Sequence, residues 1–176
     1  MKTLLTEEQL REGIHRMAAE IQKHYEGKPL TIVGVLMSSI VLVADLIRLL
    51  NVPLRVELVQ ARCDSTRGVC LGPMAIDEDL LSFGVHGRHV LLVDAIFDAG
   101  HTLWNLVPQI DDLGPISIRT AVLFQKEGQC EVPMKPDFLG FTIPNEFVVG
   151  YGLDYRDQYR NLPYLAALEP GEIAQS

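Results

Sequence analysis

The sequence predicts an α/β fold in which a parallel, twisted sheet is flanked by helices. Strand-like apolar segments alternate with segments of helical periodicity along most of the chain. The predicted strands over 30–36 and 89–93 are dominated by apolar β-formers, as strands covered on both faces are. Residues 30–50 run from a strand through a short loop into a helix, which is the unit from which parallel sheets are built.

The first half of the chain opens with a predicted amphipathic helix over 6–25. Thr6 and Gln9 form a capping-box pattern at its start, and apolar residues follow at helical spacing. The next expected elements are a strand over 30–36, a helix over 40–50, a strand over 54–60 and an irregular excursion over 61–79. This half therefore supplies two strands of the predicted sheet.

The second half of the chain continues the alternation of strands and helices. The strand over 89–93 ends in a loop over 94–102 that contains two aspartates and a glycine. The elements expected after it are a helix near 103–113 and strands over 118–124 and 147–151. With 176 residues, 48% of them hydrophobic, and no repeat or interdomain linker, residues 1–176 are expected to form one domain.

Charge and cysteine content limit the partners and the compartment. The net charge of -8 argues against a nucleic-acid partner, which needs clustered Lys and Arg. The longest apolar stretch, 30–44, is shorter than the about 20 residues that cross a bilayer, so no membrane partner is expected. Cys63, Cys70 and Cys130 are odd in number and lack metal-ligand spacing, which favours reduced thiols in a cytoplasmic protein.

The loop over 94–102 carries the clearest chemical signal. In open parallel sheets, ligands bind at the carboxyl ends of the strands, where this loop is expected to lie. It offers the carboxylates of Asp94 and Asp98, a glycine at 100 and a hydroxyl at Thr102. The helix that follows presents free backbone N–H groups that can hold a phosphate. Spacing alone fits a phosphate-binding loop and an ordinary βα turn equally well.

Three segments together resemble a known family. Residues 90–103 consist of an apolar run, Asp94, three apolar residues, Asp98, Ala99 and then Gly-x-Thr-Leu. The other two segments are the strand-loop-helix over 30–50 and the run over 147–164, which begins Phe-Val-Val-Gly-Tyr-Gly-Leu-Asp-Tyr. With these segments the chain, over about residues 5–168, resembles the hypoxanthine-guanine phosphoribosyltransferase family. The resemblance implies the type I phosphoribosyltransferase fold, with a small hood formed by the N- and C-terminal segments.

The resemblance also implies roles at the purine end of a site. Lys126 would donate to the exocyclic oxygen of a 6-oxopurine, and Phe147 would stack on the purine face. The backbone of Val148 would meet the edge of the base. Asp98 would lie beside purine N7 as the residue that handles the proton, and is the expected catalytic residue.

Further roles are implied at the phosphoribosyl end. The expected phosphoribosyl- and phosphate-binding residues are Asp94, Ala99, Gly100, His101, Thr102, Ser38, Ser39 and Arg160. Asp154 and Asp94 would hold Mg²⁺, which neutralises pyrophosphate. The implied partners are a purine base, phosphoribosyl pyrophosphate and the purine nucleoside monophosphate. Members of the family form homodimers or homotetramers, and the same is expected here.

The implied reaction is purine salvage, with transfer of a phosphoribosyl group from phosphoribosyl pyrophosphate to hypoxanthine or guanine. Several positions depart from the family pattern, all on the sugar-phosphate side: Met37 and Ser38, the segment 61–66, Ala95 and Ala99. These departures leave an alternative, a catalytically weak or inactive paralogue that binds purine nucleotides in a regulatory role. A dinucleotide-binding Rossmann domain is disfavoured, because no Gly-x-Gly-x-x-Gly follows a predicted strand.

Overall fold

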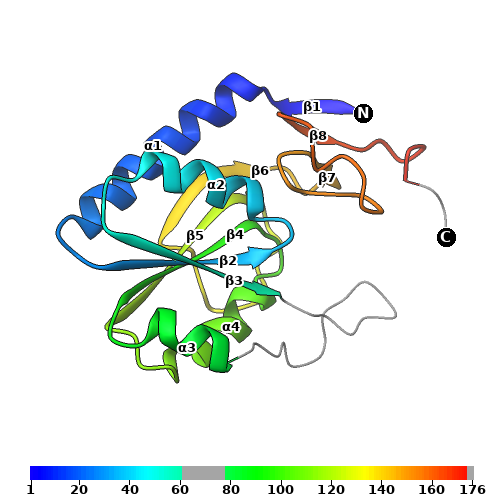
Figure 1. The fold of residues 1–176 in the computed structure, drawn as a ribbon. Coiled ribbons are helices and arrows are strands. Elements are labelled where there is room, and N and C mark those ends of the chain that lie inside the picture. Colours follow the sequence, from blue (N-terminus) through cyan, green and yellow to red (C-terminus); the bar gives the residue numbers. More distant parts are fainter. Residues whose placement is uncertain (61–77, 174–176) are drawn as a thin grey trace.

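A computed structural model describes residues 1–60 and 78–173 of the chain, which form two sheets and the helices packed on them (Figure 1). The helices are α1 (Glu7–Tyr25), α2 (Ile40–Leu49), α3 (Glu78–Val85) and α4 (His101–Asp111). The larger sheet contains β2 (Leu30–Leu36), β3 (Leu54–Gln60), β4 (His89–Phe97), β5 (Ser117–Lys126) and β6 (Phe138–Ile143). The smaller sheet contains β1 (Lys2–Leu5), β7 (Val148–Val149) and β8 (Leu165–Ala167).

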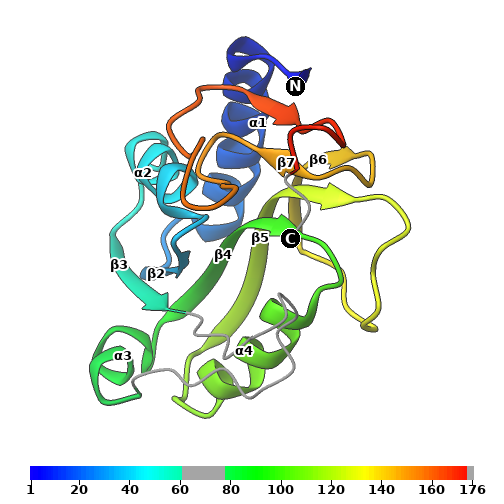
Figure 2. The ribbon, with the colours of Figure 1, turned by 90° about the vertical axis from the view of Figure 1, so that its right-hand side faces the viewer.

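The larger sheet has the strand order β3-β2-β4-β5-β6, and every neighbouring pair is parallel. Helices α1 and α2 cover one face, and α3 and α4 cover the other (Figures 1 and 2). Side chains alternate along β4, so that Leu91 and Val93 join the apolar cluster under α1 and α2. Val90 and Leu92 join the cluster on the opposite face. The predicted α/β fold, a parallel sheet flanked by helices, is confirmed.

The smaller sheet is the hood that the family resemblance predicts. Strand β8 pairs antiparallel with β1 on one side and β7 on the other, which brings the two ends of the described chain together (Figure 1). Val148 and Leu165 of the hood belong to the same apolar cluster as the residues under α1 and α2. The hood is therefore packed onto the rest of the molecule through a shared core.

The element boundaries match the sequence prediction closely in the first half of the chain. The strands over 30–36 and 54–60 are confirmed, and the capping box at Thr6 and Gln9 forms as predicted. Strand β4 is longer than predicted, because residues 94–97 continue its pairing with β5. Helix α4 begins at His101, earlier than predicted. The predicted strand over 147–151 is reduced to Val148–Val149.

Other elements were not predicted from the sequence. These are α3 and the strands β1, β6 and β8. Most of the predicted irregular excursion, the segment 61–66, Cys63 and Cys70 lie outside the described residues. Cys130 is an exposed free thiol. Within residues 1–60 and 78–173, every helix is too short or too polar to cross a membrane.

Candidate active site

The carboxyl ends of β2, β4 and β5 meet at one edge of the larger sheet, and the hood lies next to this edge (Figure 1). The loops that follow these strands carry most of the residues singled out in the sequence. The remaining ones come from the segment 147–160, which includes β7 and part of the loop over 150–164 that joins β7 to β8. We call this connection the hood loop and count it as part of the hood. The fold therefore brings the purine-end and the phosphoribosyl-end residues to the same region of the molecule.

Asp98 and Lys126 form an ion pair at this edge, with 2.7 Å between the carboxylate Oδ2 and Nζ. Asp98 follows β4 directly, and Lys126 is the last residue of the neighbouring strand β5. The lysine side chain is only 12% exposed, whereas the aspartate is 49% exposed. The carboxylate therefore remains accessible to a ligand, while the ammonium group is held beneath it.

The turn from β4 into α4 requires glycine at position 100. Gly100 has φ 90°, and a Cβ there would lie 2.6 Å from the Phe97 ring and from a methyl group of Val132. Helix α4 starts immediately afterwards, and its first backbone N–H groups face the loop, as an anion site requires. Ala99 and Thr102, which flank this turn, are partly buried.

His101 and Ala99 are both tied to the segment after β5. The His101 imidazole Nε2 lies 2.9 Å from a Glu131 carboxylate oxygen, and the Glu131 backbone N–H donates to the Ala99 carbonyl. Glu131 was not singled out from the sequence, because nothing local to it marks a contact with a loop 30 residues earlier. These contacts fix the start of α4 against the 127–136 segment.

Asp94 is almost completely buried, with 4% exposure, and its position is fixed by two hydrogen bonds. Its carboxylate Oδ1 accepts from the Ser38 hydroxyl at 3.1 Å and from the Ala95 N–H at 2.7 Å. Burial raises the pKa of Asp94 to about 6, against the lowering effect of these hydrogen bonds. Ala95 points to the other face of the sheet and is fully buried there among apolar side chains.

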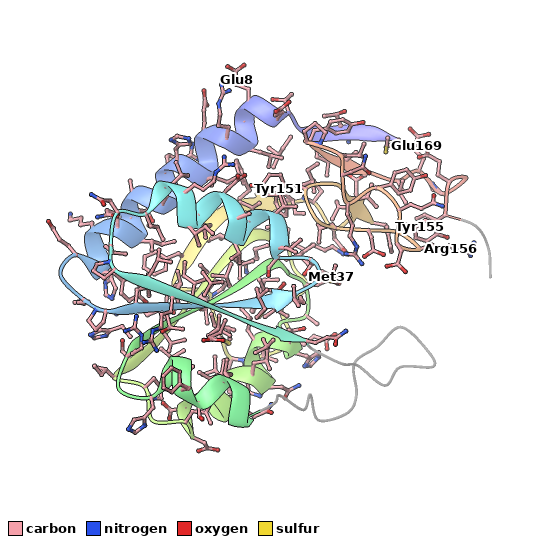
Figure 3. All side chains as sticks on the ribbon, viewed as in Figure 1. Glu8, Met37, Tyr151, Tyr155, Arg156 and Glu169 are labelled. Atoms are coloured by element: carbon pink, nitrogen blue, oxygen red, sulfur yellow. The ribbon has the colours of Figure 1, made fainter. Side chains whose placement is uncertain are left out.

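The loop over 37–39 follows β2 and contains Met37, Ser38 and Ser39. Met37 lies at the end of the strand (Figure 3). The peptide bond between Leu36 and Met37 is cis. Ser39 is buried and its hydroxyl donates to the Val35 carbonyl at 2.7 Å. The two serines therefore differ, since the Ser38 hydroxyl contacts Asp94 whereas the Ser39 hydroxyl is bonded to its own strand.

In the hood, Asp154 and Arg160 form an ion pair with 2.9 Å between Oδ1 and Nη2. The second carboxylate oxygen of Asp154 accepts from the Asp157 backbone N–H, and Arg160 Nη1 donates to the Gly152 carbonyl. Both charged side chains are about 30% exposed. The pair is thus built into the hood loop and still reachable from solvent.

Phe147 and Val148 lie at the start of the hood strand β7. The Phe147 ring is 43% exposed, and Tyr155 packs edge-on against it with 5.4 Å between ring centroids. Val148 is buried within β7. Tyr155 (Figure 3) was not assigned a role from the sequence, although it belongs to the same run as Phe147. A partly exposed aromatic ring held by a second ring is suited to stacking on a planar ligand.

The carboxylates of this region fit one kind of metal binding. In the described parts of the chain, no three His, Cys, Asp or Glu side chains gather into a set that could enclose an ion. Mg²⁺ in phosphate-handling sites is commonly held by one or two carboxylates, with the remaining ligands supplied by water and substrate phosphates. The partly exposed Asp154 carboxylate fits that arrangement.

Comparison with known proteins identifies close relatives over nearly the whole chain. Residues 1–156 match the family model of the phosphoribosyl transferase domain. The hypoxanthine-guanine phosphoribosyltransferase of Streptococcus pneumoniae is 35% identical over 168 residues, which cover 96% of this chain and 93% of that protein. The bifunctional protein TilS/HprT of Listeria innocua is 37% identical over 169 residues, but this chain spans only 26% of its length.

A solved structure supports the same assignment. The crystal structure of a hypoxanthine phosphoribosyltransferase from Staphylococcus aureus superposes with a TM-score of 0.92 at 32% identity, covering 99% of this chain and 95% of that one. The five-stranded parallel sheet with its flanking helices is thus the type I phosphoribosyltransferase fold. By sequence and by structure, the chain belongs to the hypoxanthine-guanine phosphoribosyltransferase family.

Proposed function

We propose that the protein is a purine-salvage enzyme that converts hypoxanthine or guanine and phosphoribosyl pyrophosphate into the nucleoside monophosphate and pyrophosphate. The observation that carries this proposal is the Asp98–Lys126 ion pair at the carboxyl edge of the sheet. It combines a proton acceptor and a cationic donor at 2.7 Å, as recognition of a 6-oxopurine needs. Membership of the family supports the same reaction.

The purine would be bound between the sheet edge and the hood. Lys126 would donate to the exocyclic oxygen of the base, and Phe147 would stack on its face through the exposed part of the ring. The backbone of Val148 would meet the base edge. Asp98 would take the proton at N7 as N9 forms its bond to the ribose anomeric carbon and pyrophosphate departs, so that proton and leaving group are both accounted for.

The ribose 5′-phosphate would be held by the turn at the start of α4. Backbone N–H groups of the residues in this turn supply the contacts: Ala99, Gly100, His101 and Thr102. The Thr102 hydroxyl would add a side-chain donor. Asp94 would accept from the ribose hydroxyls, in the orientation that the Ser38 hydroxyl gives it.

Pyrophosphate would lie between the 37–39 loop and the hood. Ser38 and Ser39 would border it on one side, and Arg160 would offer its guanidinium on the other. Asp154, together with Asp94, would hold Mg²⁺, which supplies charge neutralisation of the leaving pyrophosphate when it is bound. The ion pair between Arg160 and Asp154 holds the two groups next to each other, which supports a shared role at pyrophosphate and its metal.

The alternative of a catalytically weak or inactive regulatory paralogue rests on the altered side chains alone. These are Met37, Ser38, Ala95 and Ala99. None of the comparisons favours it over an active enzyme. The Ser38 contact with Asp94 also gives one of these departures a role that is compatible with activity.

An assay of the purified protein tests the proposed function. Hypoxanthine, guanine and xanthine are each incubated with phosphoribosyl pyrophosphate and magnesium, and nucleotide formation is followed. We expect the product with hypoxanthine or guanine. Absence of product together with calorimetric binding of inosine monophosphate would support the regulatory alternative. Absence of both product and binding would exclude both proposals.

We also propose that residues 1–176 form a single domain and that this domain forms a homodimer or homotetramer in the cytoplasm. Exposed apolar side chains on α2 and on the edge strand β3 favour self-association: Ile40, Ile47 and Leu58. Leu58 and Val43 of α2 both approach Gly34, so β3 presents Leu58 on the α2 side of the sheet. Sedimentation velocity of the wild type measures the number of subunits.

A further inference from the structure

Tyr151 and Asp45 are joined by a hydrogen bond between two segments that are distant in sequence. The phenol hydroxyl of Tyr151, in the hood loop, donates to Asp45 Oδ2 in α2 at 2.5 Å. Figure 3 places Tyr151 between the helices of the upper face and the hood. We propose that these two residues are a positioning pair, which holds the hood loop against the 37–39 loop and so sets the geometry of the pyrophosphate site.

The conformation of Tyr151 indicates that its place is fixed by its surroundings. Its φ is 49°, in the left-handed region that non-glycine residues rarely adopt, and its side chain is only 7% exposed. Such a conformation persists where neighbouring contacts determine it. Burial, and then the contact with Asp45, raise the pKa of the phenol, so the hydroxyl keeps its proton and remains a donor.

The residue after Tyr151, Gly152, packs directly against the backbone of the 37–39 loop. Gly152 has φ 97°, and a Cβ on it would lie 2.3 Å from the Ser38 carbonyl oxygen. The two backbones are therefore in direct contact. A shift of Tyr151 along the hood therefore changes the spacing between Gly152 and the Ser38 backbone, which borders the proposed pyrophosphate site.

The same loop also carries the charged groups of the hood. Gly152 donates its N–H to the Arg160 carbonyl and accepts from Arg160 Nη1 at 2.9 Å, and Arg160 in turn holds Asp154. One short segment thus contacts the 37–39 loop on one side and the Arg160–Asp154 pair on the other. The assignment of these two flanks to pyrophosphate and its metal rests on the proposed function.

In this proposal the pair acts through the position of the hood loop, next to Arg160, which lines the same cleft. Asp45 and Tyr151 line a cleft of about 450 Å³ between α1, α2 and residues 160–163. The Asp45 side chain is 33% exposed, so water can replace the lost hydroxyl when Tyr151 is changed to Phe. The Tyr151→Phe variant is therefore expected to fold.

A matched control is available at Tyr25. This tyrosine is also buried and its hydroxyl donates to the Val90 carbonyl at 3.3 Å, near the opposite end of β4 from the site. Tyr25→Phe removes one buried phenol hydroxyl in the same way, without a link to the hood. Comparison of the two variants separates a general loss of stability from a specific effect on the site.

The experiment measures binding by calorimetry and steady-state kinetics in parallel. For Tyr151→Phe, we expect the Kd for phosphoribosyl pyrophosphate with magnesium to rise about tenfold, the size expected for loss of a hydrogen bond to a charged group. The Kd for inosine monophosphate and the KM for the base should change less than about twofold. Tyr25→Phe should leave both Kd values at the wild-type level, whatever its melting temperature.

Substitutions at Asp45 complete the test. Asp45→Asn keeps an acceptor oxygen for the phenol and should weaken phosphoribosyl pyrophosphate binding less than Asp45→Ala does. In the double variant Tyr151→Phe/Asp45→Ala, the loss should be no larger than in the more affected single variant, because both changes remove the Tyr151–Asp45 hydrogen bond, and only Asp45→Ala also removes the ion pair with Arg48. Additive losses would overturn the inference, as would equal weakening of both ligands or no weakening in Tyr151→Phe.

The wild-type measurement separates this inference from the proposed function. If the wild type makes nucleotide and binds phosphoribosyl pyrophosphate while Tyr151→Phe matches it, the positioning role is wrong and the proposed function stands. If the wild type neither binds phosphoribosyl pyrophosphate nor makes nucleotide, the proposed function is wrong and the positioning role is rejected with it.

Discussion

The Asp98–Lys126 ion pair combines a nearly buried ammonium group with an accessible carboxylate. Lys126 is held by its aspartate partner with little exposure, and Asp98 keeps half of its surface open. A purine that binds here would replace part of the ion pair with its own hydrogen-bonding edge. The pairing therefore restricts the lysine side chain and leaves the carboxylate accessible, as the proposed role of Asp98 requires.

The first prediction concerns Asp98→Asn, which keeps the shape and hydrogen-bonding capacity of the side chain but removes the base. General acid-base help contributes 10²- to 10⁴-fold in typical enzymes, so we expect turnover to fall at least about tenfold. Binding of inosine monophosphate should stay about the same. Nucleotide formation measured beside calorimetry checks both, and equal turnover in the two proteins would remove Asp98 from the mechanism.

Melting curves of the same variant test a purely structural role for Asp98. A carboxylate at the start of α4 interacts favourably with the helix dipole, and its loss would lower stability by about 0.3–1 kcal/mol. A lower melting temperature with unchanged turnover is the pattern of a helix-stabilising residue. Slower turnover is the pattern of a catalytic one, whatever the melting temperature, because the substitution also removes the charge partner of Lys126.

Burial of the Asp94 carboxylate lowers the stability of the folded protein when the carboxylate is charged. Its pKa of about 6 in the folded protein exceeds its ordinary value of 3.8, so the folded state binds the proton more tightly than the unfolded state. Stability contributed by the protonated form is present below pH 3.8 and is lost as the pH rises toward 6. At neutral pH the buried carboxylate destabilises the protein.

The second prediction is therefore that Asp94→Asn stabilises the protein at pH 8 and leaves its stability unchanged below pH 4. The upper bound is about 3 kcal/mol, since one pKa unit corresponds to about 1.4 kcal/mol. The amide oxygen can still accept from Ser38 and Ala95. Denaturant unfolding in a chelating buffer across this pH range measures the difference. Equal stability of the two proteins at pH 8 would contradict the burial argument.

On the proposed function, the same substitution should weaken phosphoribosyl pyrophosphate binding, because a neutral amide is a poorer acceptor for ribose hydroxyls than a carboxylate. A gain in stability with a loss of phosphoribosyl pyrophosphate affinity is the expected combination at Asp94. Residues that are held at a cost to stability are frequently those that a site requires.

Most of the candidate site could be predicted from the sequence at the level of single residues. The family resemblance implies that Asp98 meets purine N7 and that Lys126 meets the exocyclic oxygen; the structure brings the two side chains together in an ion pair, and their roles at a purine stay predictions. The contact between Ser38 and Asp94 was not foreseen, since it joins loops 56 residues apart and depends on how β2 and β4 align. Tyr155 was also missed, because an edge-on ring contact leaves no periodic signal.

At the scale of elements, continuous apolar runs identified the buried strands β2 and β4, whose burial on both faces leaves no ambiguity. Strand β6, a partly buried strand at the sheet edge, was not predicted, whereas β3 at the other edge was. Strands β1 and β8 have four and three residues, too short for any period to show. They are defined by pairing with each other across the length of the chain.

The third prediction concerns the turn between β4 and α4, where Gly100→Ala should be strongly destabilising. At this position an added Cβ would be strained by the left-handed backbone and would also lie 2.6 Å from atoms of Phe97 and Val132. Both effects lower the stability of the folded protein. Gly128→Ala is the matched control, because its φ is +68° but nothing lies within 4 Å of the added Cβ. The control should lose about 1–2 kcal/mol from backbone strain alone.

We expect Gly100→Ala to lose more than this control and also to weaken inosine monophosphate binding, because relief of the contact moves the first turn of α4. Free energies of unfolding in urea and calorimetric titrations supply the two measurements. A loss equal to that of Gly128→Ala would mean that Phe97 and Val132 adjust freely around the new methyl group.

At the scale of the whole molecule, the hood and the sheet share one apolar cluster. Leu165 of β8 is fully buried in the cluster that also contains Leu91 and Val93 of the central strand β4. A hood joined to the sheet in this way has no core of its own. The two parts are therefore expected to unfold together, as a single domain does.

The fourth prediction tests this coupling with Leu165→Ala, observed from the far side of the sheet. The substitution leaves a cavity in the hood and should cost about 2–5 kcal/mol. Trp104, the only tryptophan in the chain, lies in α4 on the opposite face and reports by fluorescence. If unfolding is cooperative, the urea midpoint seen by Trp104 falls by the full amount and matches that seen by far-ultraviolet circular dichroism. A fluorescence midpoint that stays at the wild-type value would mean that the hood unfolds separately and that residues 1–176 are not one domain.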